Sequence, residues 1–425
     1  MTHRQTGTDR NSGEASPSLA RSGIIRWWVD TPLYLRILGA LGLGVATGLI
    51  LGDSAQPLAL LSKAILRLLT ALAPGLILLA IVRALAGTRM PRGVAARLAG
   101  LLATNTIVAI CIGLAVANVL QPGAHSDSTR TLESTSGAAA TPIPGSAVLD
   151  ALPKSLLGPL ADGGNVLAVL FIAVAFGMAL RPQAQRPVRT VMDLIDAAFD
   201  ALVTVLRWLV QIIPFAVFGV MASIVGARGF SGLGVLGAYV VTVLVALALQ
   251  AVFYLLRVRF GSWVRPTDLL RGGRDALLTA FSTASTTATM PVTYACLRER
   301  IGVQEKSASL GALVGTNFNN DGTALYEAVS ALFIAQLIGL DLSLYQQLVV
   351  MFTSVLASIG AAGFPEAGLV SIALVLNAVG LPLEYMGLLL TVDWLLDRCR
   401  TSVNVMGDLT VSCLLDGRQR PAGET

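Results

Sequence analysis

"VDWLLDRCRTSVNVMGD" covers residues 392–408 and places five charged side chains within seventeen residues of an otherwise apolar part of the chain. An Asp or Arg at the middle of a bilayer costs roughly 2.5–3.5 kcal/mol on insertion scales, so such residues usually have a function. On a helix, the spacing puts most of the polar residues on one face. The side chains that share this face are Asp393, Asp397, Arg400, Thr401, Asn404 and Asp408.

The composition of the chain indicates a polytopic membrane protein. Of its 425 residues, 54% are hydrophobic and 13% are charged, whereas a soluble domain carries about 25% charged residues. The net charge of +5 is modest and gives no case for a nucleic-acid partner. We expect free packing thiols rather than a disulfide or a metal site, because no CxxC spacing is present. The cysteines are Cys111, Cys296, Cys399 and Cys413.

Apolar runs of roughly 17–25 residues can cross a bilayer as helices, and basic residues mark their cytoplasmic ends. The first six predicted spans cover residues 34–52, 57–86, 98–120, 165–180, 190–224 and 235–256. Residues 1–30 are polar and are expected to form a disordered cytoplasmic tail without a signal peptide. The alternation of loops predicts that both termini are cytoplasmic. We expect the protein to lie in an inner (plasma) membrane.

The last third of the chain departs from this simple alternation. Residues 276–296 are apolar, but arginines both precede and follow them, so both ends are expected on the cytoplasmic side. This predicts a re-entrant hairpin that breaks at its Ser/Thr cluster and Pro291. A second hairpin is predicted at 349–376, entering from the other side, and span seven (307–338) and span eight (380–416) complete the fold.

Spans seven and eight share an Asn-x-x-Gly pattern, "NNDG" at 319–322 and "NVMG" at 404–407. We therefore expect two inverted copies of a broken hairpin followed by an interrupted helix. Such repeats place substrate and ion sites at the middle of the bilayer, where non-helical backbone must be buried or must line an aqueous cavity. The alternative is that these interruptions are Pro/Gly kinks in ordinary spans.

The charged face of span eight suggests a pocket for a zwitterion with an additional acid group. A guanidinium such as that of Arg400 can hold a carboxylate with two hydrogen bonds, and Asp397 can receive an ammonium group. Carboxylate and amide oxygens also suit a hard cation such as sodium. The structural alternative is internal pairing, Asp397 with Arg400 or Asp393 with Arg398.

Span seven repeats this chemistry in "TNFNNDGTALYE" (316–327). Its asparagines and Asp321 supply oxygens, Gly322 is expected to let the helix unwind, and Thr323 offers a hydroxyl. Glu327 follows about one turn later. Burial favours the neutral form of a carboxyl group, which is the property that a proton carrier needs.

These motifs resemble the dicarboxylate/amino acid:cation symporter family, which includes the excitatory amino acid transporters. The resemblance covers residues 33–415 and rests on "STTATMP" (285–291), "NNDGTALYE" (319–327), "ASIGAAGFPEAG" (357–368) and "DWLLDRCRTSVNVMGD" (393–408). It implies an all-α membrane protein of eight transmembrane helices and two re-entrant hairpins, an elevator mechanism and a homotrimer in the lipid.

The resemblance also implies a division of the chain. The scaffold takes spans one, two, four and five, and the transport domain takes the remaining spans and both hairpins. The expected segments are the tail 1–30, scaffold helices 31–95, transport helix three 96–120, the external loop with scaffold helices four and five 121–228, the transport domain 229–416 and the C-terminal tail 417–425.

The implied function is symport of an acidic amino acid, glutamate or aspartate, with Na⁺ or H⁺ as coupling ion and no cofactor. The alternative is a proton- or sodium-coupled carrier of a C4-dicarboxylate or a neutral amino acid. The implied substrate-binding residues are Arg400, Asp397, Thr401, Asn404, Thr323, Ser285, Thr286, Thr287, Phe364 and Gly368.

Three cation sites are implied in the same way, and Glu327 is implied as the proton carrier. The first site takes Asp408 with Gly315, Asn319 and Asn404; the second takes Asp321 and Asn319 with Asn105 and Thr106; the third takes carbonyl groups near Ser358, Ile359 and Ala361. Four positions depart from the family pattern, and they leave the number of coupled sodium ions open, with proton coupling as the alternative. They are Asn317, Asn320, Leu102 and Glu366.

Two other classes of function fit the sequence less well. An intramembrane serine protease needs a base, but the only histidines are His3 and His125, in the tail and in an external loop. An aspartyl protease needs a GxGD-type motif, and "VMGD" at 405–408 lacks its first glycine. A channel without an organic substrate is the remaining rival.

Overall fold

The structure is a computed structural model that describes residues 31–87, 92–124, 156, 158, 166–180, 188–229, 231–360 and 367–419. These residues form helices, with no strand among them, so the expected all-α class is confirmed. The tail 1–30 and nearly all of the loop before span four lie outside them. The helices are α2 (Leu33–Leu51), α3 (Ala59–Gly87), α4 (Arg92–Leu120), α8 (Val166–Leu180), α9 (Val191–Arg228), α10 (Ser231–Gly261), α11 (Pro266–Thr283), α12 (Thr286–Ala295), α13 (Glu305–Ser309), α14 (Gly315–Phe318), α15 (Asp321–Leu337), α16 (Leu344–Gly360), α17 (Ala367–Ala378) and α18 (Met386–Asp416).

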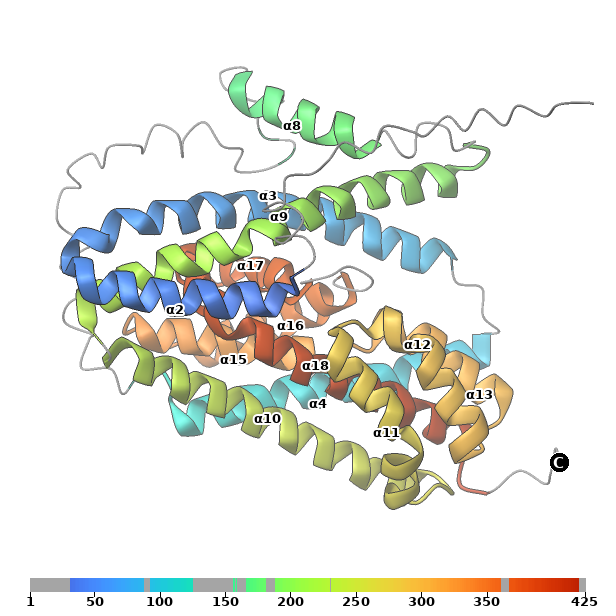
Figure 1. The fold of residues 1–425 in the computed structure, drawn as a ribbon. Helices are drawn as coiled ribbons and strands as arrows, with labels where there is room; N and C mark the ends of the chain where they lie inside the picture. The colour runs from blue at the N-terminus through green and yellow to red at the C-terminus, as the bar shows by residue number, and fades with distance from the viewer. Residues whose placement is uncertain are drawn as a thin grey trace, which may run out of the picture.

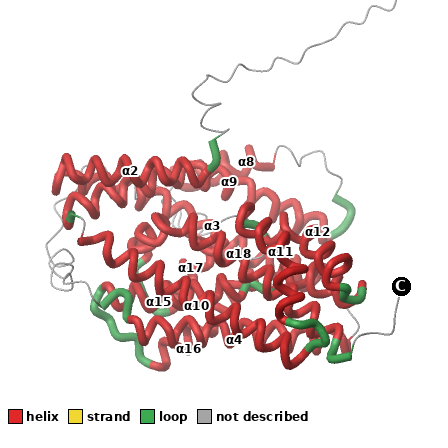
Figure 2. The backbone as a smooth tube through the Cα atoms, turned by 60° about the horizontal axis from the view of Figure 1, so that its bottom comes forward, coloured by secondary structure: helices red, strands yellow, loops and turns green. Residues whose placement is uncertain are grey.

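The helices pack in two groups. In the first group α2, α3 and α8 all pack against the long helix α9, and the chain reverses between α2 and α3 at the 3₁₀ turn η1 (Gly52–Leu58) (Figure 1). In the second group α4, α10, α11, α15 and α17 surround α18, which runs through the middle of the molecule. Figure 2 shows the first group along one side of the molecule. The groups meet where α18 contacts α9 and where α16 and α17 contact α3.

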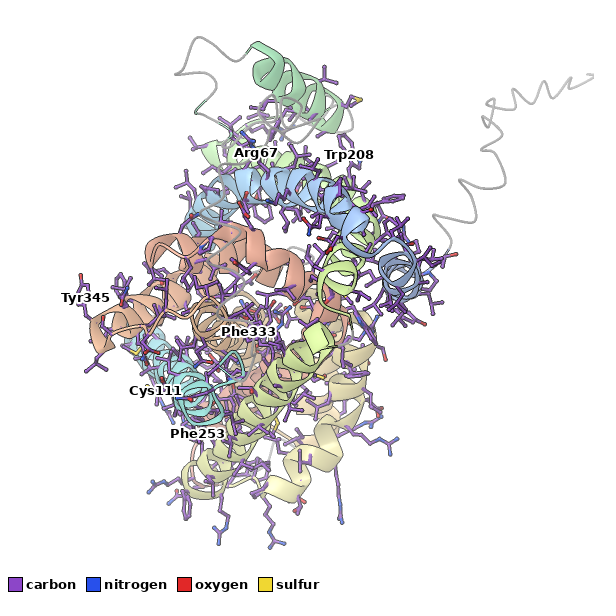
Figure 3. The ribbon with its side chains drawn as sticks, turned by 90° about the vertical axis from the view of Figure 1, so that its left-hand side faces the viewer. Arg67, Cys111, Trp208, Phe253, Phe333 and Tyr345 are labelled. Carbon is purple, nitrogen blue, oxygen red and sulfur yellow. The ribbon has the colours of Figure 1, made fainter. Side chains whose placement is uncertain are left out.

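Apolar side chains fill the core of the molecule and also cover much of its surface. Large apolar side chains point outward, with Ile50 81% and Val119 80% exposed. Figure 3 shows Tyr345 at the outer edge, whereas Phe333 lies in the interior, where its ring stacks on that of Tyr239 at 4.5 Å. Charged groups such as Asp321 are completely buried. This arrangement fits a protein surrounded by lipid.

Within the described residues, four helical stretches are long and apolar enough to cross a membrane: Leu33–Leu76, Ala96–Leu120, Val191–Ala227 and Gly234–Gly261. The helices of the other predicted spans differ for identifiable reasons. The described part of α8 has 15 residues, span seven is broken, and α18 carries the charges of the opening motif. Length and hydropathy alone therefore detect only part of the membrane domain.

The first hairpin is longer than predicted, and its break lies within the predicted Ser/Thr cluster but not at Pro291. Its first arm, α11, begins at Pro266, ten residues before the predicted start at 276. The break lies at Ala284, which has a left-handed backbone with φ of 50°, and Ser285 then caps α12 by accepting a hydrogen bond from the Ala288 N–H at 3.2 Å. Pro291 lies inside α12, so the prediction of a break there was wrong.

Span seven is broken, as predicted, but not by unwinding at Gly322. A π-helical turn over Leu310–Val314 and the short α14 lead to Asn319 and Asn320, whose ψ angles of 68° and 47° lie outside the helical region. The helix α15 restarts at Asp321 and includes Gly322 in its first turn. The second hairpin consists of α16 and α17, and its connection, 361–366, lies outside the described residues.

The predicted interruption of span eight is contradicted. The helix α18 is continuous from Met386 to Asp416 through the "NVMG" segment. Gly407 instead permits a close approach, because a Cβ at this position would overlap the side chain of Asn319 and would lie 2.8 Å from the hydroxyl of Tyr254. The glycine thus brings the broken span seven against a helix that stays intact.

Candidate functional site

Arg400 occupies the centre of the charged face of α18. Its side chain is 1% exposed, and its Nη2 lies 2.8 Å from Asp397 Oδ1 and 3.0 Å from Asp393 Oδ1. The exposed fraction is 2% for Asp393 and 16% for Asp397. The predicted internal pair of Asp397 with Arg400 is therefore present, and Asp393, for which the alternative was pairing with Arg398, forms an ion pair with Arg400.

The remaining nitrogens of Arg400 have no hydrogen-bond partner among the described residues. These are Nε and Nη1, both fully buried. The guanidinium carbon lies 3.9 Å from the centre of the Tyr326 ring, and a Cβ on Gly368 of α17 would lie 2.7 Å from Nη1. A buried guanidinium with free N–H groups is costly unless an acceptor binds it, so Arg400 is a candidate anion site.

Asn404, one turn further along α18, joins this helix to the start of α15. Its Oδ1 accepts a hydrogen bond from the Gly322 N–H at 2.8 Å. Its Nδ2 lies 3.4 Å from both Asn320 Oδ1 and Thr323 Oγ1. Thr401 is buried beside it and donates its hydroxyl to the carbonyl oxygen of Asp397 at 2.8 Å. The predicted substrate residues of spans seven and eight thus form one cluster.

The first predicted cation site is also assembled. Asn319 donates from Nδ2 to Asp408 Oδ1 at 3.1 Å and to the carbonyl oxygen of Asn404 at 3.2 Å. Gly315 packs so closely on the carboxylate of Asp408 that a Cβ would overlap it. The Oδ1 of Asn319 is buried without a hydrogen-bond partner among the described residues. Carboxylate, amide and carbonyl oxygens are the ligands that hard cations prefer.

The second predicted cation site is brought together, but its oxygens already have protein partners. Asp321 accepts a hydrogen bond from Thr106 at 2.6 Å through Oδ1 and one from the hydroxyl of Tyr254 at 2.5 Å through Oδ2. Asn105 accepts a hydrogen bond from Arg257 Nη1 through Oδ1. Of the third predicted set, Ser358 accepts a hydrogen bond from Asn320 at 3.0 Å through its carbonyl oxygen. The side chain of Ile359 and the whole of Ala361 lie outside the described residues.

Glu327 lies deep in the second group of helices. It is completely buried, and neither carboxyl oxygen has a hydrogen-bond partner that meets ordinary geometry within the described part of the chain. The hydroxyls of Ser354 on α16 and Ser371 on α17 are its polar neighbours, and Arg400 is close enough to act on it electrostatically. The predicted proton carrier is therefore next to the predicted anion site.

The predicted hairpin residues have different outcomes. Ser285, Thr286 and Thr287 lie at the first tip, and the hydrogen bonds at this tip are internal, such as that from Thr289 to the carbonyl oxygen of Ser285 at 2.8 Å. No hydrogen bond in the described structure connects this tip with Arg400. Phe364 lies outside the described residues, and Gly368 lies against Arg400.

Arg398 holds the first hairpin to α18. It donates from Nη1 to the carbonyl oxygens of Phe281 and Ser282, at 2.9 and 2.7 Å. These carbonyls belong to the last turn of α11, where a cation is favourable. Its guanidinium carbon also lies 5.0 Å from the ring centre of Tyr34 on α2.

Sequence reasoning missed three side chains in the site. Tyr326 lies against Arg400, and Tyr254 and Arg257 of α10 reach Asp321 and Asn105. For Tyr254 and Arg257, the sequence contains a weak indication. Tyr254 and Arg257 are three residues apart in an apolar helix, so they share a face, and a polar face within a membrane segment points toward protein rather than lipid.

The fold and site therefore define a multi-pass membrane protein with a buried charged centre, which is the arrangement of a transporter. The model of the "Sodium:dicarboxylate symporter family" matches residues 33–418. This chain belongs to that family. The expectation of a transporter rather than an enzyme is confirmed by this membership.

Several curated proteins are similar to this chain. "Excitatory amino acid transporter 3" of Mus musculus is 40% identical over 256 residues, which is 60% of this chain and 49% of the mouse protein. "Excitatory amino acid transporter" of Caenorhabditis elegans is 42% identical over 252 residues, 58% of this chain and 50% of that protein. "Excitatory amino acid transporter 1" of Rattus norvegicus is 39% identical over 260 residues, 58% and 46%. The chain spans about half the length of these relatives.

Proposed function

We propose that this protein is a secondary active symporter that imports an acidic amino acid, glutamate or aspartate, together with sodium ions, protons or both. The observation that carries this proposal is Arg400, a buried guanidinium with Nε and Nη1 unpaired and two aspartates beside it. The names of the relatives support an amino acid as substrate, and the family description supports sodium and a dicarboxylate.

In this account, Arg400 receives the side-chain carboxylate of the substrate and Asp397 receives its ammonium group. Asp397 is the more exposed of the two aspartates paired with Arg400, so it is the one that an incoming ligand can reach. Thr401, Asn404 and Thr323 complete the pocket. Charge-assisted hydrogen bonds are the strongest available to such a ligand, and they replace contacts that Arg400 makes internally when the pocket is empty.

Sodium binds, in this account, beside Asp408 with oxygens of Asn319, Gly315 and Asn404, and near the carbonyl oxygen of Ser358. The support is the unpaired amide oxygen of Asn319 and the proximity of the Asn404 carbonyl and the Asp408 carboxylate, both of which accept from the Asn319 amide nitrogen. Because the Asn404 carbonyl contacts Asn319 while its side chain reaches Thr323, cation and substrate binding share one residue. Shared residues are a direct way to couple two ligands.

Glu327 is proposed as the proton carrier. An unpaired carboxylate is expensive to bury, whereas a neutral acid is not, and this side chain is surrounded by protein with hydroxyls as its polar neighbours. The proximity of Arg400 gives its protonation state a way to affect the substrate site.

The proposed architecture has eight transmembrane helices and two re-entrant hairpins in an inner membrane, with cytoplasmic termini and a homotrimeric assembly. Spans one, two, four and five form the scaffold, and the other spans and the hairpins move as an elevator. The two packing groups of helices support this division. Gly368 of the second hairpin lies against Arg400, and in this account that hairpin acts as a gate that moves to admit a substrate.

Uptake into proteoliposomes tests the function. Purified protein is given labelled aspartate, glutamate or a C4-dicarboxylate such as succinate, while sodium, proton and potassium gradients are imposed one at a time. Accumulation of an acidic amino acid under a sodium or proton gradient is the expected result. Entry of succinate without either amino acid overturns the substrate assignment in favour of a C4-dicarboxylate carrier, and flux independent of every gradient indicates a channel.

A further inference from the structure

Arg257 of α10 places a positive charge within the second predicted cation site. Its Nη1 donates to Asn105 Oδ1 and, at 3.2 Å, to the carbonyl oxygen of Leu101. Both acceptors belong to α4, which is the helix expected to supply ligands for that cation. The amide oxygen that a sodium ion would need therefore already faces a guanidinium.

The other oxygens of this site are engaged as well. The two carboxylate oxygens of Asp321 accept hydrogen bonds from the hydroxyls of Thr106 and Tyr254. Arg257 is close enough to Asp321 to act on it electrostatically. Two hydroxyl groups therefore donate hydrogen bonds to the carboxylate of Asp321, and the nearby guanidinium of Arg257 opposes its negative charge.

Arg257 and its neighbours on α10 face the same cluster. Its guanidinium carbon lies 5.7 Å from the ring centre of Phe253, one turn back on the same helix. Tyr254, three residues before Arg257, points its hydroxyl to the same cluster. One face of α10 thus delivers both a hydroxyl and a cation to the ligands contributed by α4 and α15.

A guanidinium differs from a sodium ion in two respects that matter here. It has only donors and remains charged at any physiological pH, so it takes up oxygen lone pairs permanently. It is also covalently attached, so it cannot be released to the other side of the membrane. A second cation beside the buried side chains of Asp321 and Asn105 would meet like-charge repulsion from Arg257.

We propose that Arg257 is a tethered cation that closes the Asn105 side of the second predicted cation site, so that this protein couples its substrate to one sodium ion fewer than its oxygen ligands would allow. The inference rests on the proposed function, because only a cation-coupled transporter has a coupling number to reduce. Of the three predicted cation sites, two then remain for transported sodium.

The test uses the full-length protein in proteoliposomes. The apparent affinity for aspartate is measured as a function of sodium concentration, and the slope of the double-logarithmic plot counts the sodium ions coupled to substrate binding. In Arg257→Gln, we expect this slope to rise by about one over wild type, since the amide removes the charge. Arg257→Lys keeps the charge and is expected to keep the wild-type slope.

Arg259→Gln is the matched control. This arginine lies on the same helix two residues further on, is exposed, and is near the ring of Phe260, so its loss is expected to leave the slope unchanged. An active Arg257→Gln protein with the wild-type slope overturns the inference while the proposed function stands.

A second measurement needs no variant. The reversal potential of aspartate flux through the wild-type protein gives the number of sodium ions carried with each substrate molecule. Two or fewer is the expected result, and three overturns the inference even if Arg257→Gln does not fold. Failure of the wild type to transport any acidic amino acid under any cation gradient overturns the proposed function, and the inference falls with it.

Discussion

The segments 319–322 and 404–407 have the same Asn-x-x-Gly spacing and meet at the centre of the molecule, yet only the first leaves the helix. In span seven, Asn319 and Asn320 lie between α14 and α15. In span eight, the corresponding residues are part of one uninterrupted helix. The same short pattern therefore serves two structures, and the difference lies in what each segment contacts.

The continuous helix α18 supplies a hydrogen-bond acceptor to the start of α15 in the broken span seven. The first N–H groups of a helix lack partners within the helix, and Asn320 at the N-cap of α15 makes no capping hydrogen bond with its own side chain. Asn404 of α18 accepts from the Gly322 N–H instead. A side chain of α18 thus caps α15. The uninterrupted helix α18 holds this acceptor opposite the break in span seven.

The largest effect is expected from the rigid side of this comparison. Arg400→Ala removes the only guanidinium with free N–H groups in the described part of the charged face, and loss of one partner of a buried charge pair costs about 2–5 kcal/mol. Uptake of acidic amino acids is expected to fall at least ~30-fold, and neutral amino acids are expected to be admitted.

Arg398→Ala provides the control for Arg400. Its guanidinium binds the carbonyl groups of Phe281 and Ser282 and not the aspartates, so a change below about tenfold is expected for a partly exposed interaction. Labelled aspartate uptake distinguishes the two variants. Unchanged aspartate kinetics in Arg400→Ala would contradict its role as the anion site.

Gly407→Ala tests whether the glycine of span eight serves close approach. The added Cβ overlaps Asn319 and crowds Tyr254, and such overpacking typically costs about 1–3 kcal/mol. We expect a lower melting temperature and a severalfold weaker dependence of uptake on sodium, because Asn319 is displaced from Asp408.

Gly237→Ala in α10 is the matched control for this substitution. A Cβ there has no heavy atom within 4 Å, and Ala is favoured over Gly within a helix by about 1 kcal/mol. Its melting temperature is expected to stay the same or to rise. If both variants behave alike, Gly407 is not needed for the contact between spans seven and eight.

Glu327→Gln probes the buried carboxyl group on α15. The amide does not gain or lose a proton in the physiological pH range, so it cannot carry one across the membrane. Net uptake is therefore expected to lose its dependence on pH, while exchange of internal for external substrate continues. Glu384→Gln is a control, since that carboxylate is exposed and pairs with Lys63. Acid-stimulated uptake that persists in Glu327→Gln would exclude this residue as the proton carrier.

The smallest effect is expected from Pro291→Ala. Because Pro291 lies inside α12 and the hairpin turns at Ala284 and Ser285, its removal restores one hydrogen-bonding N–H without changing the turn. Uptake is expected to stay within about twofold of wild type. A loss of transport would show that the proline, and not the left-handed residue, determines the shape of the hairpin.

The sequence was sufficient for the buried charged face of span eight, because burying charge in a membrane is expensive. The spacing of Asp393, Arg400 and Asp408 predicted one polar face, and α18 presents it buried as expected. The internal pair of Asp397 with Arg400 was foreseen as an alternative. The roles assigned to these residues stay predictions.

The errors have a common physical origin. Gly and Pro mark positions where a helix can break, but tertiary contacts decide whether it does. Gly322 and Gly407 stay helical because each accommodates a neighbouring segment, and Pro291 is tolerated inside α12. Ala284, a residue that rarely adopts positive φ, could not be identified as the turn. Arg257 directly follows the predicted end of span six at residue 256, and nothing in its charge indicated that it would reach Asn105.

The central claim is that one cluster between α15 and α18 holds an acidic amino acid and its driving cation together. Two calorimetric titrations of the purified protein test it most directly. Aspartate is titrated in the presence and in the absence of sodium, and sodium is titrated in the presence and in the absence of aspartate. Linkage requires that each ligand strengthen the other by the same factor, and we expect this factor to exceed tenfold and to disappear in Arg400→Ala. Equal aspartate affinity with and without cations, at every pH tested, would contradict the account.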